Sequence, residues 1–497
     1  MGTSIIAFDA TEIDGGILVQ DSEGEEVLAK NFDQIGKFLL EDYDDVDRGT
    51  KYLKVVYDLD QFAGTIFKTL PVELVDKFDD GETKVQYGSF KIFYIPSKML
   101  GIDGKFRTLI NGNIYKEDRA ETVIYHLKQY YPEALDLPPQ DVKDMGIQLI
   151  NQLQRMGLNP TRLVSPISIY EESVLSHMTV PRACHVPEEA EDALDYSMAV
   201  MNREWRSAYR LGYWETAYDY DLTSAYPSLI AKLRDIRQAK WWKSNQEQDC
   251  DWGIMKGWLT INLDISPIVC EDNILRSGTW LEYITTEDAK FIRDYKIGDF
   301  KAIDGWFMNY AIKDCYPFDI AMNRLFGMRA TNHLVKLVSK KISVGLGGKF
   351  AEIKYDGSYG DYFNPIYRLM TTDRARLKVA KFIYDHELQD NLIGVMVDGV
   401  LADKELKLKG GSLMGNWRLN KPTPALVLST GYQFTGDKKP GNISFAQIYN
   451  AMKAHPNKTS YCDIEFNSIS HDRKFDVLPK TGGQLLNNIY ESKPISV

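Results

Sequence analysis

Short apolar runs that end in a carboxylate recur along the chain. Ile5–Asp9 and Val55–Asp58 have this form, and Tyr218–Asp221 ends in the same way. Runs of this length and composition are typical of strands. Because side chains alternate along a strand, we expect Asp219 on the same face as Asp221. The pattern therefore predicts buried strands whose ends carry acidic groups.

A hairpin is predicted from Asn391 to Ala402. Two apolar runs flank the pair Asp398-Gly399, and an Asp-Gly pair in this setting is a strong hairpin signal. The tip would then carry the Asp398 carboxylate. Hairpins of this kind are also common in proteins where the turn has no chemical role, so the turn alone does not indicate function.

The segment Ile320–Ala351 predicts a cationic helix. Its apolar residues follow a helix-compatible pattern, and we expect Gly345–Gly348 to end the helix. The segment holds no Asp or Glu, and its cations Arg329, Lys336 and Lys340 are spaced so that they share one helix face. A solvated lysine face is the alternative, although such a face usually includes acids.

Composition sets limits on the class of protein. The chain has 497 residues, a length that exceeds what one hydrophobic core usually supports. Hydrophobic residues make up 44% of it. Its five cysteines are scattered and never in CxxC spacing, which favours reduced thiols in a cytosolic compartment over a structural zinc. The chain lacks an apolar stretch of about 18 residues, which argues against membrane insertion. The net charge is -11, but binding to nucleic acid depends on the local field in a groove.

The motif that begins at Asp221, at the end of the third acidic strand, resembles the first catalytic motif of family B DNA polymerases. The family pattern is Asp, two variable residues, Ser, Leu or a similar residue, Tyr, Pro and Ser, and this chain has Asp221-Leu222-Thr223-Ser224-Ala225-Tyr226-Pro227-Ser228. By this resemblance Asp221 holds two divalent metal ions, and the Leu222 carbonyl is a further ligand. The resemblance also implies that Tyr226 lies under the incoming sugar, with Ser224 in the nucleotide site.

The cationic segment continues into a resemblance to the second polymerase motif, Lys-x3-Asn-Ser-x-Tyr-Gly. Lys340 and Gly348 are in register with it. Three positions depart from the motif: Val344, Gly345 and Gly347. The resemblance implies that Lys340 contacts the α-phosphate of the incoming nucleotide, while Lys336 and Arg329 contact the outer phosphates. A phosphate-binding loop is excluded, because the GxxxxGK[ST] spacing is missing.

The predicted hairpin resembles the third motif, Asp-Thr-Asp-Ser, with Asp398 at the second Asp and Met396 at the first. The resemblance implies that Asp221 and Asp398 bind two Mg²⁺ ions, for which Mn²⁺ can substitute. Two-metal phosphoryl transfer needs one ion near the attacking 3′-oxygen and another at the pyrophosphate. Asp219 is a candidate for the auxiliary carboxylate missing at Met396, and a solvated or salt-bridged Asp219 is the alternative.

Shorter matches indicate contacts with DNA. Ser207–Gly212 resembles the YxGG region that contacts the template strand, and Thr371–Phe382 predicts an amphipathic helix like the palm helix of the family. Met414–Trp417 and Tyr432 resemble the strand and the Lys-x-Tyr motif that grip the primer, although Thr430 replaces the lysine. The DNA-binding candidates are Tyr209, Gly212, Gly348, Lys349, Arg374 and Tyr432. Each match is equally compatible with core packing.

The first 200 residues resemble the outline of a proofreading exonuclease. Asp9 and Asp58 end predicted strands, and Asp144 opens a predicted amphipathic helix. The family's Asp-x-Glu motif is out of register here, because Ala10 and Thr11 both separate Asp9 from Glu12. We therefore expect an exonuclease-like fold whose activity is lost or impaired. Acids with only a solvated role are the alternative.

Together the motifs predict an α+β multidomain protein. The resemblance implies a right-hand polymerase with palm, fingers and thumb, preceded by a ribonuclease H-like, exonuclease-type domain. The expected domains are residues 1–190 (exonuclease-like), 191–319 (first part of the palm), 320–352 (fingers), 353–430 (second part of the palm) and 431–497 (thumb). The processivity insertion of protein-primed polymerases is expected to be absent, because the segment before Thr371 is short.

The leading functional hypothesis is a DNA-directed DNA polymerase, a nucleotidyltransferase that acts in viral or mobile-element DNA replication. Its expected partners are primer-template DNA and deoxynucleoside triphosphates, with priming or replication proteins as candidates. We expect no membrane association, and the host cytoplasm as the location if the chain is viral. The alternative is a weakened or inactive polymerase-fold protein that binds nucleic acid as a replication accessory, which the losses at Met396, Gly347 and Thr430 favour. An exonuclease-only enzyme is a third class.

Overall fold

The structure is a computed structural model of the whole chain. It describes residues 2–40, 50–110, 113–132, 137–163, 165–210, 212–263, 265–269, 277–354, 357–408, 411–429 and 432–435. Side chains are described for all of these except residues 2–4, 50–52, 104–110, 113–121, 213, 428–429 and 432–435.

The described residues form two compact units. The first unit contains Met1–Thr179 and Leu325–Ser343, and the second contains Val180–Arg324 and Val344–Val497. The N-terminal part of the first unit ends at Thr179, and the domain boundary expected at residue 190 stays a prediction. The finer division into palm, fingers and thumb stays a prediction.

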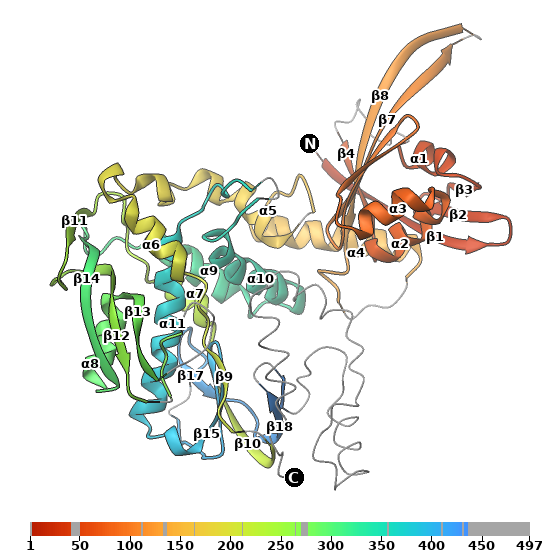
Figure 1. Cartoon of the computed structure of the whole chain (residues 1–497). Coiled ribbons are helices and arrows are strands. Elements are labelled where there is room, and N and C mark those ends of the chain that lie inside the picture. The colour runs from red at the N-terminus through yellow and green to blue at the C-terminus, as the bar shows by residue number, and fades with distance from the viewer. Residues whose placement is uncertain are drawn as a thin grey trace. The chain divides into compact units, whose positions relative to one another are not determined.

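The first unit is built on one mixed sheet (Figure 1). Its elements are β1 (Gly2–Ile13), β2 (Gly16–Asp21), β3 (Glu26–Ala29), α1 (Phe32–Leu40), β4 (Thr50–Val56), α2 (Leu59–Ile66), α3 (Val72–Asp79), β5 (Lys84–Tyr87), β6 (Phe90–Ile95), β7 (Met99–Ile110), β8 (Asn113–His126), α4 (Pro139–Arg155) and α5 (Pro166–Ser173). The strand order in the described residues is β3-β2-β1-β4-β8-β7-β6-β5. β1 pairs antiparallel with β2 but parallel with β4, and β4 pairs parallel with β8. This is the ribonuclease H-like arrangement that the sequence predicts, with an antiparallel extension at β5–β7.

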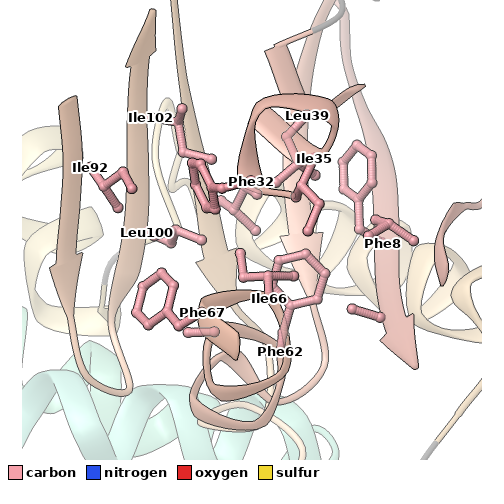
Figure 2. Close-up of a cluster of buried hydrophobic side chains, with 14 of the residues drawn as sticks. Phe8, Phe32, Ile35, Leu39, Phe62, Ile66, Phe67, Ile92, Leu100 and Ile102 are labelled. Atoms are coloured by element: carbon pink, nitrogen blue, oxygen red, sulfur yellow. The ribbon is translucent and has the colours of Figure 1, made fainter. Parts of the chain in front are cut away.

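Helices α1 and α2 cover this sheet with apolar faces. Phe32, Ile35 and Leu39 recur at helical spacing along α1 and are fully buried (Figure 2). Phe8 on β1 joins the same cluster, while the next residue, Asp9, is exposed. Residues 5–8 of β1 are buried on both faces of the sheet, so the acid is exposed because it lies beyond the part of the strand that is covered on both faces.

The second unit contains two sheets and one long helix. Its elements are α6 (Asp192–Val200), β9 (Arg206–Ala208), β10 (Gly212–Leu222), α7 (Ala225–Ile230), β11 (Lys240–Ser244), β12 (Trp252–Ile261), β13 (Gly278–Thr285), α8 (Thr286–Asp294), β14 (Gly298–Asn309), α11 (Pro365–Asp385), β15 (Leu392–Met396), β16 (Gly399–Ala402), β17 (Trp417–Leu419), β18 (Thr423–Ser429) and β19 (Tyr432–Thr435). One sheet has the order β19-β18-β10-β16-β15-β9, with β17 also pairing with β10, and the other has the order β11-β14-β12-β13. Apolar residues of α11 and of both sheets form one buried cluster, so this helix fixes the sheets against each other.

The predicted cationic helix is in fact two helices, α9 (Asp319–Met328) and α10 (His333–Lys349). Arg329 lies in the connection between them, so the expected single stripe is reduced to Lys336 and Lys340 on α10. The glycines at 345–348 do not end α10, which continues to Lys349. Glycine costs about 1 kcal/mol in a helix interior, but Leu346 and Phe350 are completely buried there, and this burial outweighs the cost.

Two other helix starts differ from the sequence expectation. Helix α11 begins at Pro365, six residues before Thr371, where the Asn364 side chain accepts a hydrogen bond from the Tyr367 N–H. Helix α4 begins at Pro139, so Asp144 lies inside the helix and does not open it. Proline is favoured at the first helical position, and this signal marks both starts better than the amphipathic pattern does.

Candidate active site

The two aspartates of the first and third motifs meet where β10 pairs with β16. Asp221 lies opposite Gly399 in the antiparallel register. The Leu222 N–H also donates a hydrogen bond to the Asp398 carbonyl oxygen, with an N···O distance of 3.1 Å. Residues far apart in sequence are thus neighbours across one strand pair, as the metal hypothesis requires.

Asp398 lies at a strained hairpin tip. Met396 pairs with Gly399, so the two-residue turn consists of Val397 and Asp398. The expected Asp398-Gly399 turn is therefore wrong by one residue, because Gly399 already opens β16. Val397 has a φ of 59°, which is unfavourable for a β-branched residue. Its N–H donates to the Trp205 carbonyl oxygen at 2.9 Å, a tertiary contact that helps to hold this conformation.

Asp221 forms an ion pair with Arg418. The Arg418 side chain donates from Nε and Nη2 to Asp221 Oδ2, at 3.1 and 2.5 Å. Arg418 occupies the position opposite Asp221 on β17, so strand pairing brings the two side chains together. The side-chain exposures are 52% for Arg418 and 24% for Asp221, which leaves the carboxylate accessible to solvent.

Asp219 lies on the same strand as Asp221, with buried Tyr220 between them pointing to the core. Asp219 Oδ2 accepts a hydrogen bond from Asn420 Nδ2 at 2.9 Å. Among the residues that the structure describes, no group of three or more His, Cys, Asp or Glu side chains is arranged to hold a metal ion. Asp219 therefore does not complete a three-carboxylate site in this conformation, and its auxiliary role stays a prediction.

The remaining donor set suits a hard divalent cation. Asp221 and Asp398 supply carboxylate oxygens, and Mg²⁺ prefers oxygen ligands while keeping several waters. Two partly exposed carboxylates on neighbouring backbone segments therefore fit Mg²⁺, with water and a ligand's phosphates available to fill its coordination shell. The Leu222 side chain has no ligand atom, so only its backbone carbonyl could contribute.

Tyr226 lies on α7, directly after the acidic strand. The chain turns at Ser224, which has a φ of 52° and precedes the first residue of α7. Tyr226 donates its hydroxyl proton to Glu204 Oε1 at 3.3 Å. Burial, and then the charge of Glu204, raise the pKa of Tyr226 well above its ordinary value. The nearby charge of Asp398 acts in the same direction, and Tyr226 follows Leu222, whose N–H donates to the Asp398 carbonyl oxygen, by four positions.

The three phosphate-binding candidates belong to the first unit. Lys336 and Lys340 are exposed on α10, one turn apart. Arg329 is partly buried, and its guanidinium donates to Ser343 Oγ. Burial lowers the pKa of Arg329. Contact of these side chains with a nucleotide stays a prediction.

Two of the predicted DNA-binding residues engage acidic neighbours. Lys349 Nζ lies 2.8 Å from Glu352 Oε1, and Arg374 donates to Glu287 through Nε and Nη2. Each of these two cations thus already pairs with a carboxylate of the protein.

The other four DNA-binding candidates are two tyrosines and two glycines. The Tyr209 hydroxyl accepts from Trp205 Nε1 at 3.2 Å. Gly212 opens β10 with a φ of 135°, Gly348 is exposed on α10, and Tyr432 opens β19. Thr430, where the family has a lysine, lies outside the described residues.

The exonuclease-like acids are engaged in structural contacts. Asp58 caps α2 by accepting from the Asp60 and Gln61 N–H groups, and it pairs with Lys128 at 2.6 Å. Burial raises the pKa of Asp58, but these contacts together outweigh that effect and lower it. Glu12 pairs with Lys68 at 2.5 Å.

The remaining two acids of this group, Asp9 and Asp144, are exposed. Asp144 Oδ1 accepts from Gln140 Nε2 at 3.3 Å. These acids do not form a metal cluster in the described part of the chain, and the expectation of a lost or impaired exonuclease stays a prediction.

Sequence reasoning missed three residues at the site. Arg418 directly follows the Met414–Trp417 match, and this position in the sequence was the available signal. Its place opposite Asp221 comes only from strand pairing. Glu204 and Arg368 carry no motif, and only the tertiary structure brings them to Tyr226.

Two bulk expectations can be checked on the described residues. Cys184, Cys250 and Cys315 are free thiols there. The helices that the structure describes include none with the length and apolar character needed to cross a bilayer.

Comparison with known proteins rests on structure alone. The chain matches no protein-family model. It also matches no curated protein sequence. Phi29 DNA polymerase in a ternary complex with primer-template DNA and incoming nucleotides is similar at a TM-score of 0.55 and 12% identity, over 87% of this chain and 86% of that one. The binary complex of the same polymerase with primer-template DNA gives a TM-score of 0.58 and 10% identity, over 90% and 94%. The expected family B polymerase fold is thereby confirmed.

Proposed function

We propose that this chain is a DNA-directed DNA polymerase that extends a primer with deoxynucleoside triphosphates. One observation carries the proposal. In a chain with the fold of phi29 DNA polymerase, Asp221 and Asp398 lie side by side on the β10–β16 pair, next to Tyr226. Primer-template DNA and deoxynucleotides would be the corresponding partners, since the phi29 ternary complex contains primer-template DNA and incoming nucleotide substrates.

The site residues divide the work of phosphoryl transfer. Asp221 and Asp398 would hold Mg²⁺, which when bound lowers the pKa of the attacking hydroxyl and neutralises the leaving pyrophosphate. Lys340, with Lys336 on the same helix, would bind the nucleotide phosphates as point charges. Tyr226 would pack under the sugar and exclude a 2′-hydroxyl by steric clash.

Primer extension with Mg²⁺ or Mn²⁺ tests this proposal. Asp221→Asn and Asp398→Asn should each abolish extension, because an amide binds the cation far more weakly than a carboxylate. Asp294→Asn is a matched control, since this acid is exposed on α8 and takes no part in the site. Wild-type protein that adds no deoxynucleotide would refute the proposal, as would extension that survives both site substitutions.

Two variants test finer assignments in the same assay. Tyr226→Ala should admit ribonucleotides if the tyrosine is the steric barrier, and unchanged discrimination would contradict that role. Asp219→Asn should slow single-turnover extension and shift its metal dependence if Asp219 is an auxiliary carboxylate. Unchanged rates would leave Asp219 with only its Asn420 contact.

A nucleic-acid-binding accessory role is the second candidate. It is favoured by Met396, which takes the place of a carboxylate on β15, and by Gly347, which leaves α10 without the family's aromatic residue. Under this hypothesis the chain binds primer-template DNA but extends nothing. A DNA-binding assay run beside primer extension separates the two.

Replication of a viral or mobile-element genome is the setting that we propose for this activity. The likeness to phi29 DNA polymerase in fold supports it. Priming or replication proteins would then be further partners, and the host cytoplasm the location of a viral enzyme.

A further inference from the structure

Glu204 links the predicted sugar-facing tyrosine to two arginines. Its Oε1 accepts from the Tyr226 hydroxyl at 3.3 Å and lies 3.7 Å from Arg368 Nη2. Its Oε2 lies 2.7 Å from Arg206 Nη2. Two arginines thus flank the Glu204 carboxylate, and a charged acceptor binds a hydroxyl more strongly than a neutral one.

The backbone around Glu204 is anchored to the hairpin of the third motif. Trp205 is 1% exposed, and its carbonyl accepts from the Val397 N–H at 2.9 Å. Arg206 pairs with Met396 in the β9–β15 register. The backbone next to Glu204 is therefore anchored to the hairpin that carries Asp398. Through its hydrogen bond to the Tyr226 hydroxyl, Glu204 can hold the tyrosine side chain in a fixed orientation.

The neighbouring helix offers Tyr226 no aromatic support. A Cβ atom added at Gly347 would lie 3.8 Å from Tyr226 Cδ1 and 3.9 Å from Arg368 Nη1. The second-motif position that carries a tyrosine in the family thus faces Tyr226 as a bare backbone. The guanidinium of Arg368 lies over the Tyr226 ring instead, 5.9 Å from the ring centroid. Arg368 is itself fixed by the Asn202 side chain at 3.3 Å.

We infer that Glu204 is a positioning residue that holds the Tyr226 ring in place for sugar discrimination, with Arg368 as its partner. The inference rests on the proposed polymerase function and adds a specificity role that the sequence motifs do not contain. Without the carboxylate, Tyr226 would keep its ring but lose the contact that sets its orientation. The barrier to a 2′-hydroxyl would then weaken.

Steady-state extension with matched deoxy- and ribonucleotides tests this role. For Glu204→Ala we expect the ratio of kcat/KM for deoxy- over ribonucleotide to fall roughly tenfold, the scale of one lost hydrogen bond to a charged group. The change should come mainly from a lower KM for the ribonucleotide. Tyr226→Phe, which removes the donor, should give a similar loss, and the double variant should lose no more than either single one. Glu204→Gln, which keeps an acceptor oxygen, should restore most of the discrimination.

Glu247→Ala is the matched control, because Glu247 also pairs with an arginine, Arg293, on other elements. It should leave the ratio unchanged. Extension by Glu204→Ala with wild-type discrimination would overturn the inference alone. A ratio that falls equally in Glu204→Gln, or additive losses in the double variant, would also overturn it. Wild-type protein that extends no primer would overturn the proposed function and this inference together.

Discussion

Replacing Arg418 by alanine should strengthen the binding of divalent cations to the protein without DNA. If Asp221 binds a metal ion as proposed, the guanidinium and the ion would compete for Asp221 Oδ2, which accepts from Arg418 Nε and Nη2. The pair is partly exposed, at 52% and 24% for the two side chains. Exposed pairs contribute about 0.2–1 kcal/mol. Removing the competitor should therefore lower the dissociation constant about 1.4- to 5-fold.

Titration of the protein with Mn²⁺, followed by electron paramagnetic resonance of the free ion, measures this directly. Nucleotide and DNA are left out, so the result does not depend on catalysis. Arg418→Lys keeps the positive charge but loses the guanidinium donors, and it should bind Mn²⁺ close to wild type. Asp221→Asn should bind it more weakly than any of these.

An Arg418→Ala protein that binds Mn²⁺ with unchanged or lower affinity would refute the competition. It would mean either that Asp221 binds the cation through Oδ1 alone or that Arg418 itself stabilises the site. Loss of Mn²⁺ binding in Arg418→Ala with an intact thermal transition would point to the second explanation.

Four further predictions concern stability, measured by chemical denaturation. Arg376 is buried between Asp288 and Asp373, so Arg376→Met should cost about 3–5 kcal/mol by stranding Asp288. Burial, and then Asp288, raise the pKa of Asp373, so the stabilisation from its proton is lost as the pH rises through the folded-state pKa. Asp373→Asn should therefore gain stability relative to wild type with rising pH, and a flat difference would contradict this. Val397→Asn should relieve the φ of 59° and stabilise by about 0.5–1 kcal/mol; a loss would show that valine packing dominates. Gly348→Ala has open space for its Cβ and should raise stability by about 0.5–1 kcal/mol; a loss of stability would show that the local backbone needs glycine.

Local patterns predicted the strands of the site well. The strand that carries Asp221 and the hairpin at Asp398 follow from apolar runs and turn residues, whereas the ribonuclease H-like start of the chain was implied only by the family resemblance. Boundaries were predicted less well. The hairpin turn is shifted to Val397-Asp398, and α10 passes through its glycines, because tertiary burial outweighs local preference where the two disagree.

The sequence by itself determined which residue types this protein can use for chemistry, since motif spacing fixes Asp221, Tyr226 and Asp398 on a strand, a helix and a hairpin. Only the tertiary structure decided what surrounds them. Arg418 reaches Asp221, and Glu204 reaches Tyr226, through strand pairing and side-chain packing between distant segments. Such contacts depend on register and on which faces meet, and neither quantity is encoded in the local pattern of any one segment.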